Sequence, residues 1–82
     1  MYDLLSKEGL KYIIECVIDN AHDAINEYKE DRNNKFSQGK MIAYYEVLDT
    51  IKNRLIVREA DLDEFGIGID LDKMFDTSET NK

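Results

Sequence analysis

The sequence predicts an all-α protein: an antiparallel helical hairpin followed by a short C-terminal segment. Three observations support this fold class. The 82 residues include no proline and four glycines, which favours long uninterrupted helices. Two stretches carry apolar residues at alternating steps of three and four, the spacing of one helix face. A chain of this length buries only about 60–65% of its unfolded surface, so we expect one domain with a thin core.

The first helix is expected over about residues 6–32. Ser6 or Asp3 can cap its start, and Lys29 near its end suits the helix dipole. On a helical wheel the apolar residues fill an arc of roughly 140°, which is wider than a coiled-coil seam. This helix should therefore contact more than one neighbour. The residues that set its period are Leu10, Ile14, Val17, Ala21, Ala24 and Tyr28.

The second helix is expected over about residues 34–59, after a polar turn in which Asn33 or Asn34 can serve as the cap. So short a connection makes the two helices antiparallel neighbours. The apolar stripe that should face the first helix consists of Met41, Tyr44, Leu48, Ile51 and Leu55.

The second helix also carries another apolar strip, formed by Phe36, Ala43 and Val47. It lies roughly 100° around the helix from the first stripe, so one hairpin cannot cover both. Either the C-terminal segment covers one strip, or a second copy of the chain does. We favour a homodimer that forms a four-helix bundle with the tail contributing; the alternative is that the tail alone completes a monomer.

The C-terminal tail, residues 60–76, combines acidic and large apolar residues. Alternation at Ile67, Ile69 and Leu71 indicates an extended stretch. Helical turns are expected near 61–65 and 70–75, with Asp61 and Asp70 as caps. Residues 1–76 then form a single helical domain, and residues 77–82 are expected to be frayed.

The charge of the chain is concentrated in this tail. Residues 1–58 sum to −1, whereas residues 59–79 sum to −7, the same value as the whole chain. The tail can close the core, or it can dock on a basic partner and compete there with nucleic acid. We favour core closure. The possible interaction surface consists of Phe36, Ala43, Val47, Phe65, Ile67, Ile69, Leu71 and Phe75.

Four acidic residues at paired spacing suggest one enzymatic alternative. Glu27-x-x-Glu30 and Glu46-x-x-Asp49 are similar to the paired-acid motif of the all-α nucleoside-triphosphate pyrophosphohydrolases. That resemblance implies carboxylates from two helices holding magnesium over the phosphates. On the wheel, however, all four point away from the hairpin interface. We therefore predict no catalytic residue and a non-enzymatic protein.

Other constellations are incomplete. Asp61, Asp63, Gly66 and Asp72 follow part of a calcium-loop pattern, but Phe65 stands where an oxygen ligand is needed. His22 and Cys16 are each the only residue of their type, so neither builds a metal site or a catalytic triad. We predict no metal and no cofactor. The eleven basic residues are scattered, so nucleic-acid binding is not expected.

The segment FSQGKMIAYYEVLDTIKNRL, residues 36–55, resembles small uncharacterised all-α proteins of Gram-positive bacteria, some of them carried on mobile elements. The likeness covers about a quarter of the chain and implies a bacterial source without naming an activity. The N-terminal stretch has no basic leader, and Glu15 interrupts its apolar run, so we expect neither a signal peptide nor a membrane span. With a single cysteine, a reducing cytoplasm is the expected location.

The function predicted from the sequence is therefore contact with other proteins. We expect a small cytosolic helical homodimer that acts as a regulator or accessory factor, with an unidentified protein partner and no role at a membrane.

Overall fold

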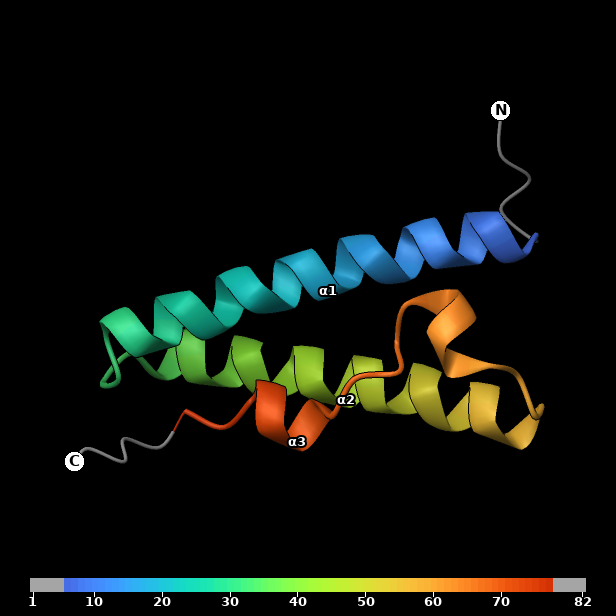
Figure 1. Cartoon of the computed structure of the whole chain (residues 1–82). Coiled ribbons are helices and arrows are strands. Elements are labelled where there is room, and N and C mark those ends of the chain that lie inside the picture. The colour runs from blue at the N-terminus through green and yellow to red at the C-terminus, as the bar shows by residue number, and fades with distance from the viewer. Residues whose placement is uncertain (1–5, 78–82) are drawn as a thin grey trace.

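The computed structural model describes residues 6–77 of the chain and consists of helices joined by short connections. Helix α1 spans Lys7–Glu30 and helix α2 spans Lys35–Val57. A 3-10 helix, η1, spans Leu62–Phe65, and a last turn, α3, spans Leu71–Met74. The two long helices run antiparallel along each other, and the tail returns over α2 (Figure 1). The predicted all-helical class and the hairpin are confirmed.

Side-chain caps fix where each helix begins. The Ser6 hydroxyl accepts a hydrogen bond from the backbone N–H of Gly9 at 3.0 Å, and the Asn34 side chain accepts one from Ser37 at 3.1 Å. Such bonds satisfy backbone donors that have no partner inside the helix. Helix α1 ends at Glu30, two residues before the expected end, because the chain turns where Asp31 accepts a hydrogen bond from the N–H of Asn33.

The tail contains the two predicted helical turns, and the connection between them bends at Ile69. The Asp61 side chain caps η1 by accepting a hydrogen bond from the backbone N–H of Asp63 at 3.0 Å. The Asp70 side chain caps α3 in the same way by accepting a hydrogen bond from the backbone N–H of Lys73 at 3.2 Å. Gly66 ends η1 with φ of 74°, a left-handed conformation that glycine adopts without steric cost. Residues 78–82 of the end that was expected to be frayed over 77–82 lie outside the described residues, and so does the candidate cap Asp3.

The core lies between the hairpin and the tail. Its main cluster combines residues from both long helices with three from the tail, and a smaller cluster of Ala24, Ile25 and Met41 lies near the α1–α2 turn. Since burial of each large apolar side chain contributes roughly 1.5–3 kcal/mol, the tail supplies a substantial share of the folding free energy. The buried members of the main cluster are Ile14, Ala21, Leu48, Phe65, Ile67 and Leu71.

Polar contacts fasten the tail to one side of the hairpin. The Tyr45 hydroxyl donates to Asp72 at 2.6 Å, and Lys52 Nζ donates to the carbonyl oxygen of Ile69 at 2.5 Å. The rings of Tyr45 and Phe75 meet edge to face with centroids 5.3 Å apart. The tail therefore covers the side of α2 that carries Tyr45 and Lys52. Within residues 6–77, no helix is both long enough and apolar enough to cross a membrane.

Candidate functional site

The structure separates the predicted interaction residues into two groups. On α2, Phe36 is 75% exposed, Val47 is 46% exposed, and Ala43 is also exposed. In the tail, Phe65, Ile67 and Leu71 are buried in the core, while Ile69 and Phe75 are half-buried against it. The apolar side chains of the tail therefore serve the chain's own core, and the α2 strip is the part that stays accessible.

The exposed strip on α2 is longer than its three apolar residues. Positions 36, 40, 43, 47, 50 and 54 are spaced by four and three in alternation, so their side chains share one face of the helix. We call this face the open stripe; it consists of Phe36, Lys40, Ala43, Val47, Thr50 and Arg54.

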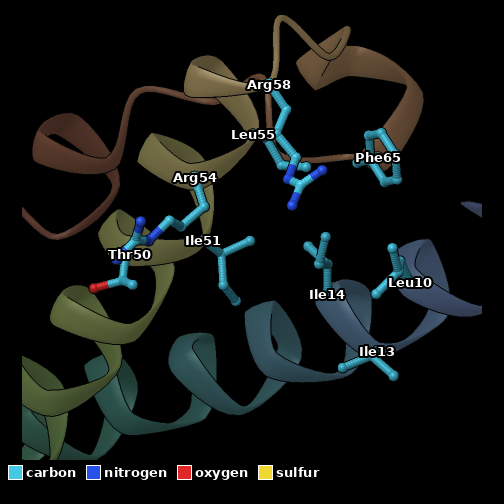
Figure 2. A pocket seen from close by; sticks show the side chains of 9 residues that line it. All are labelled: Leu10, Ile13, Ile14, Thr50, Ile51, Arg54, Leu55, Arg58 and Phe65. Atoms are coloured by element: carbon cyan, nitrogen blue, oxygen red, sulfur yellow. The ribbon is translucent and has the colours of Figure 1, made fainter. Parts of the chain in front are cut away.

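A cavity of about 330 Å³ opens beside the C-terminal half of the open stripe, between α1 and α2. Figure 2 shows its lining, and we call it the α1–α2 cavity. Thr50, Arg54 and Arg58 lie on its α2 side, with Arg58 reaching toward Ile14 and Leu10. Its apolar lining comes from three elements: Leu10, Ile13, Ile14, Ile51, Leu55 and Phe65.

The stripe and the cavity form one continuous surface. A shallower depression along α2 is lined by Ala43 and Val47 and shares Thr50 and Ile51 with the cavity. On the α1 side, Leu10 and Ile13 are each 39% exposed at the cavity. Contiguous apolar surface of this kind, bordered by polar side chains, marks interaction sites more often than isolated exposed residues do.

The basic residues along this surface differ in whether a carboxylate pairs with them. Lys40 Nζ lies 3.1 Å from Glu27 Oε1 on α1 and 6.0 Å from the centre of the Phe36 ring. Arg54 and Arg58, in contrast, are exposed, and no carboxylate in the described part of the chain pairs with either. The two guanidinium groups at the cavity are therefore available to a group outside the chain.

The acidic residues of the enzymatic alternative have other neighbours. Glu27 pairs with Lys40, and Asp49 accepts a hydrogen bond from Asn53 at 3.3 Å. Glu30 and Glu46 are exposed. Among residues 6–77, no three His, Cys, Asp or Glu side chains gather closely enough to hold a metal ion. The contact between Glu27 and α2 was not predicted from the helical wheel. The Glu27 position faces away from the apolar stripe, but its side chain pairs with Lys40 of α2.

The acids of the calcium-loop pattern also have structural roles. Asp61 caps η1, Asp72 accepts a hydrogen bond from the Tyr45 hydroxyl, and Phe65 is buried in the core. His22 and Cys16 are exposed on α1.

The two groups with clearly shifted pKa values lie where the tail is fastened. A hydrogen bond to Glu64, 2.6 Å away, raises the pKa of Lys7, and the charge of Glu64 adds to this. The hydrogen bond that Tyr45 donates to Asp72 raises the pKa of Tyr45, again with the carboxylate charge as the second cause. Neither group lies on the open stripe or in the cavity lining.

Comparison of the chain with protein-family models, curated proteins and solved structures gives no match. We therefore infer function from the geometry of the two helices and the tail. The sequence pointed to Phe36, Ala43 and Val47 but missed the cavity and its arginines. One signal was present: Arg54 follows Phe36 by 18 residues, which is five full turns of an α-helix.

Proposed function

We propose that this protein is a non-enzymatic homodimer that acts through protein contacts, as a regulator or accessory factor. The observation that carries the proposal is the exposed surface formed by the α1–α2 cavity and the apolar residues of the open stripe, which the tail reaches only through Phe65 in the cavity lining. Exposed apolar surface gains free energy when a second surface removes it from water.

The tail is not free to cover this surface in the described structure. Its large side chains Ile67 and Leu71 are buried in the core, and Phe65, which is also buried, lines only one part of the cavity. We propose that a second copy of the chain covers this surface. Two copies of the same helical face can pack against each other around a two-fold axis, the commonest symmetry of homodimers, and would complete a four-helix arrangement.

The size of the surface suits such a dimer. Helices of 23 and 24 residues are roughly 34 Å long and together about 20 Å wide, so one side of the hairpin offers roughly 700 Å². Standard protein interfaces bury about 800 Å² on each partner. At roughly 700 Å² this side of the hairpin is slightly smaller than a standard interface, so we expect a dissociation constant in the micromolar range rather than an obligate assembly.

Sedimentation velocity over a concentration series from low micromolar to millimolar tests this function. We expect the wild-type chain to pass from monomer to dimer within that range. A Val47→Glu variant should dimerise at least about tenfold more weakly, because it places a charge in the interface. Ile42→Glu is the matched control: Ile42 is 48% exposed against 46% for Val47 but lies outside the stripe. A chain that stays monomeric at millimolar concentration would exclude the homodimer.

A further inference from the structure

The open stripe carries a projecting side chain and an unfilled space at opposite ends. Phe36 projects from the first turn of α2 with three quarters of its surface exposed. The α1–α2 cavity lies beside Arg54, five turns further along the same face. Phe36 and Arg54 therefore point in the same direction and lie about 27 Å apart along the helix axis. No single chain can bring the two together.

A second copy whose α2 runs antiparallel to the first places the Phe36 of each copy beside the Arg54 of the other. If two α2 helices pack antiparallel around a two-fold axis at the level of residue 45, positions whose numbers add to 90 face each other. Phe36 then faces Arg54, Lys40 faces Thr50, and Ala43 faces Val47. These are the alternating layers of an antiparallel coiled coil, and each contact occurs in both directions, as an isologous interface requires.

We propose that the protein dimerises in this register, with the Phe36 ring of each copy inserted into the α1–α2 cavity of the other. The inference rests on the proposed homodimer and specifies its geometry. The cavity has room for the ring: it measures about 330 Å³, whereas an apolar cavity of about 150 Å³ accommodates benzene. Its lining of Leu10, Ile51 and Leu55 supplies the apolar contacts that a phenyl ring requires.

The charges on the stripe favour this register over its competitors. In a parallel pair, Lys40 would face Lys40 and Arg54 would face Arg54, which places like charges together. The antiparallel register separates these charges, because Lys40 meets Thr50 and remains paired with Glu27 of its own chain. Arg54, which has no carboxylate partner within residues 6–77, meets the face of an aromatic ring instead.

Filling the cavity also disfavours registers in which one α2 is shifted along the α2 of the other copy. A shift of one heptad keeps the same type of layers but moves Phe36 about 10 Å along the axis. The ring then lies either beyond the end of the partner's α2 or over Val47, and the cavity stays unfilled. Filling the cavity therefore selects one register among the three that the spacing allows.

Disulfide trapping between two single-cysteine variants tests the register. Both variants carry Cys16→Ser; one adds Lys40→Cys and the other adds Thr50→Cys, which leaves Phe36 and Arg54 in place. We expect a mixed disulfide when the two proteins are oxidised together, because these positions face each other in the dimer. Each variant alone should give little disulfide, since two equivalent positions are then about 15 Å apart, beyond the 4.4–6.8 Å that a disulfide spans between Cα atoms.

The outcomes separate this inference from the homodimer proposal. A disulfide formed by Lys40→Cys with itself would show a parallel pair and overturn the register. A dimer in sedimentation without the mixed disulfide would also overturn the register but keep the homodimer, whereas a strict monomer would end both.

A second variant tests the insertion of the ring itself. Phe36→Ala should weaken dimerisation roughly tenfold to a hundredfold, as removal of an aromatic anchor from a pocket does. Ile56→Ala is the control, since Ile56 is also exposed but lies on the opposite side of α2. Equal dimerisation of Phe36→Ala and the wild type would overturn the insertion.

Discussion

Leu48 and Val47 are neighbours on α2, yet Leu48 is fully buried and Val47 is nearly half exposed. The difference arises from what covers each side of the helix. The side of Leu48 packs against α1 and against a tail fastened by Tyr45 and Lys52. The side of Val47 has no cover within residues 6–77. One helix thus divides its apolar residues between the fold of its own chain and a side that we propose contacts a second copy.

The largest expected effect compares these two neighbours directly. Leu48→Ala should lower the free energy of unfolding by about 2–5 kcal/mol, because it leaves a cavity among buried side chains. Val47→Ala should change it by less than about 1 kcal/mol at a concentration where the chain is monomeric. Urea denaturation at low protein concentration measures both. Similar losses for the two variants would mean that the sides of α2 do not differ as described.

A smaller effect concerns Gly66, the residue that ends η1 within the tail. Gly66→Ala should destabilise the protein by about 1–2 kcal/mol, because Gly66 has φ of 74°, a left-handed conformation that a Cβ atom disfavours. Gly39→Ala is the control on α2, where a Cβ would meet no atom within 4 Å. There alanine should stabilise the helix by up to about 1 kcal/mol. Thermal unfolding measures the stability of both variants. A Gly66→Ala variant as stable as the wild type would argue against the left-handed conformation of Gly66.

The smallest effect depends on pH and again concerns the tail side. The hydrogen bond from Tyr45 to Asp72 requires the phenolic proton and raises the pKa of Tyr45 above its ordinary value of 10.0. Its contribution to stability is complete below pH 10.0 and is lost as the pH rises through the raised value. Tyr45→Phe should therefore be less stable than the wild type at neutral pH.

The difference between these two proteins should shrink at alkaline pH. Urea denaturation of wild type and Tyr45→Phe at several pH values measures it, and Tyr28→Phe serves as a control for tyrosine ionisation in general. A stability difference that stays constant through the alkaline range would show that the Tyr45 to Asp72 bond does not fasten the tail.

Local features of the fold could be predicted from the sequence because they depend on residues close together in the chain. The caps at Ser6, Asn34, Asp61 and Asp70 are examples, since each satisfies a backbone N–H two or three residues away. The side of α2 that the tail covers could not be predicted. It depends on the turn after α2, where Glu59 adopts a positive φ of 59°, and no pattern of residue types indicates that conformation.

The candidate site was predicted in part for the same reason. Periodicity identified Phe36, Ala43 and Val47 as a separate strip, because helical spacing alone decides which residues share a face. The α1–α2 cavity could not be predicted, because it depends on how far Leu10 and Ile13 stand from α2 and on the position of Phe65. Such spaces arise from packing between elements, not from the pattern within one element.

The most direct test of the central claim is an isotope-filtered nuclear Overhauser experiment on a dimer formed from labelled and unlabelled chains. It detects only contacts between different copies. We predict contacts from the Phe36 ring of one copy to the methyl groups of Leu10, Ile51 and Leu55 of the other. Contacts between copies that involve Ile67 or Leu71 instead would contradict the account, because they would place the interface on the tail side of the hairpin.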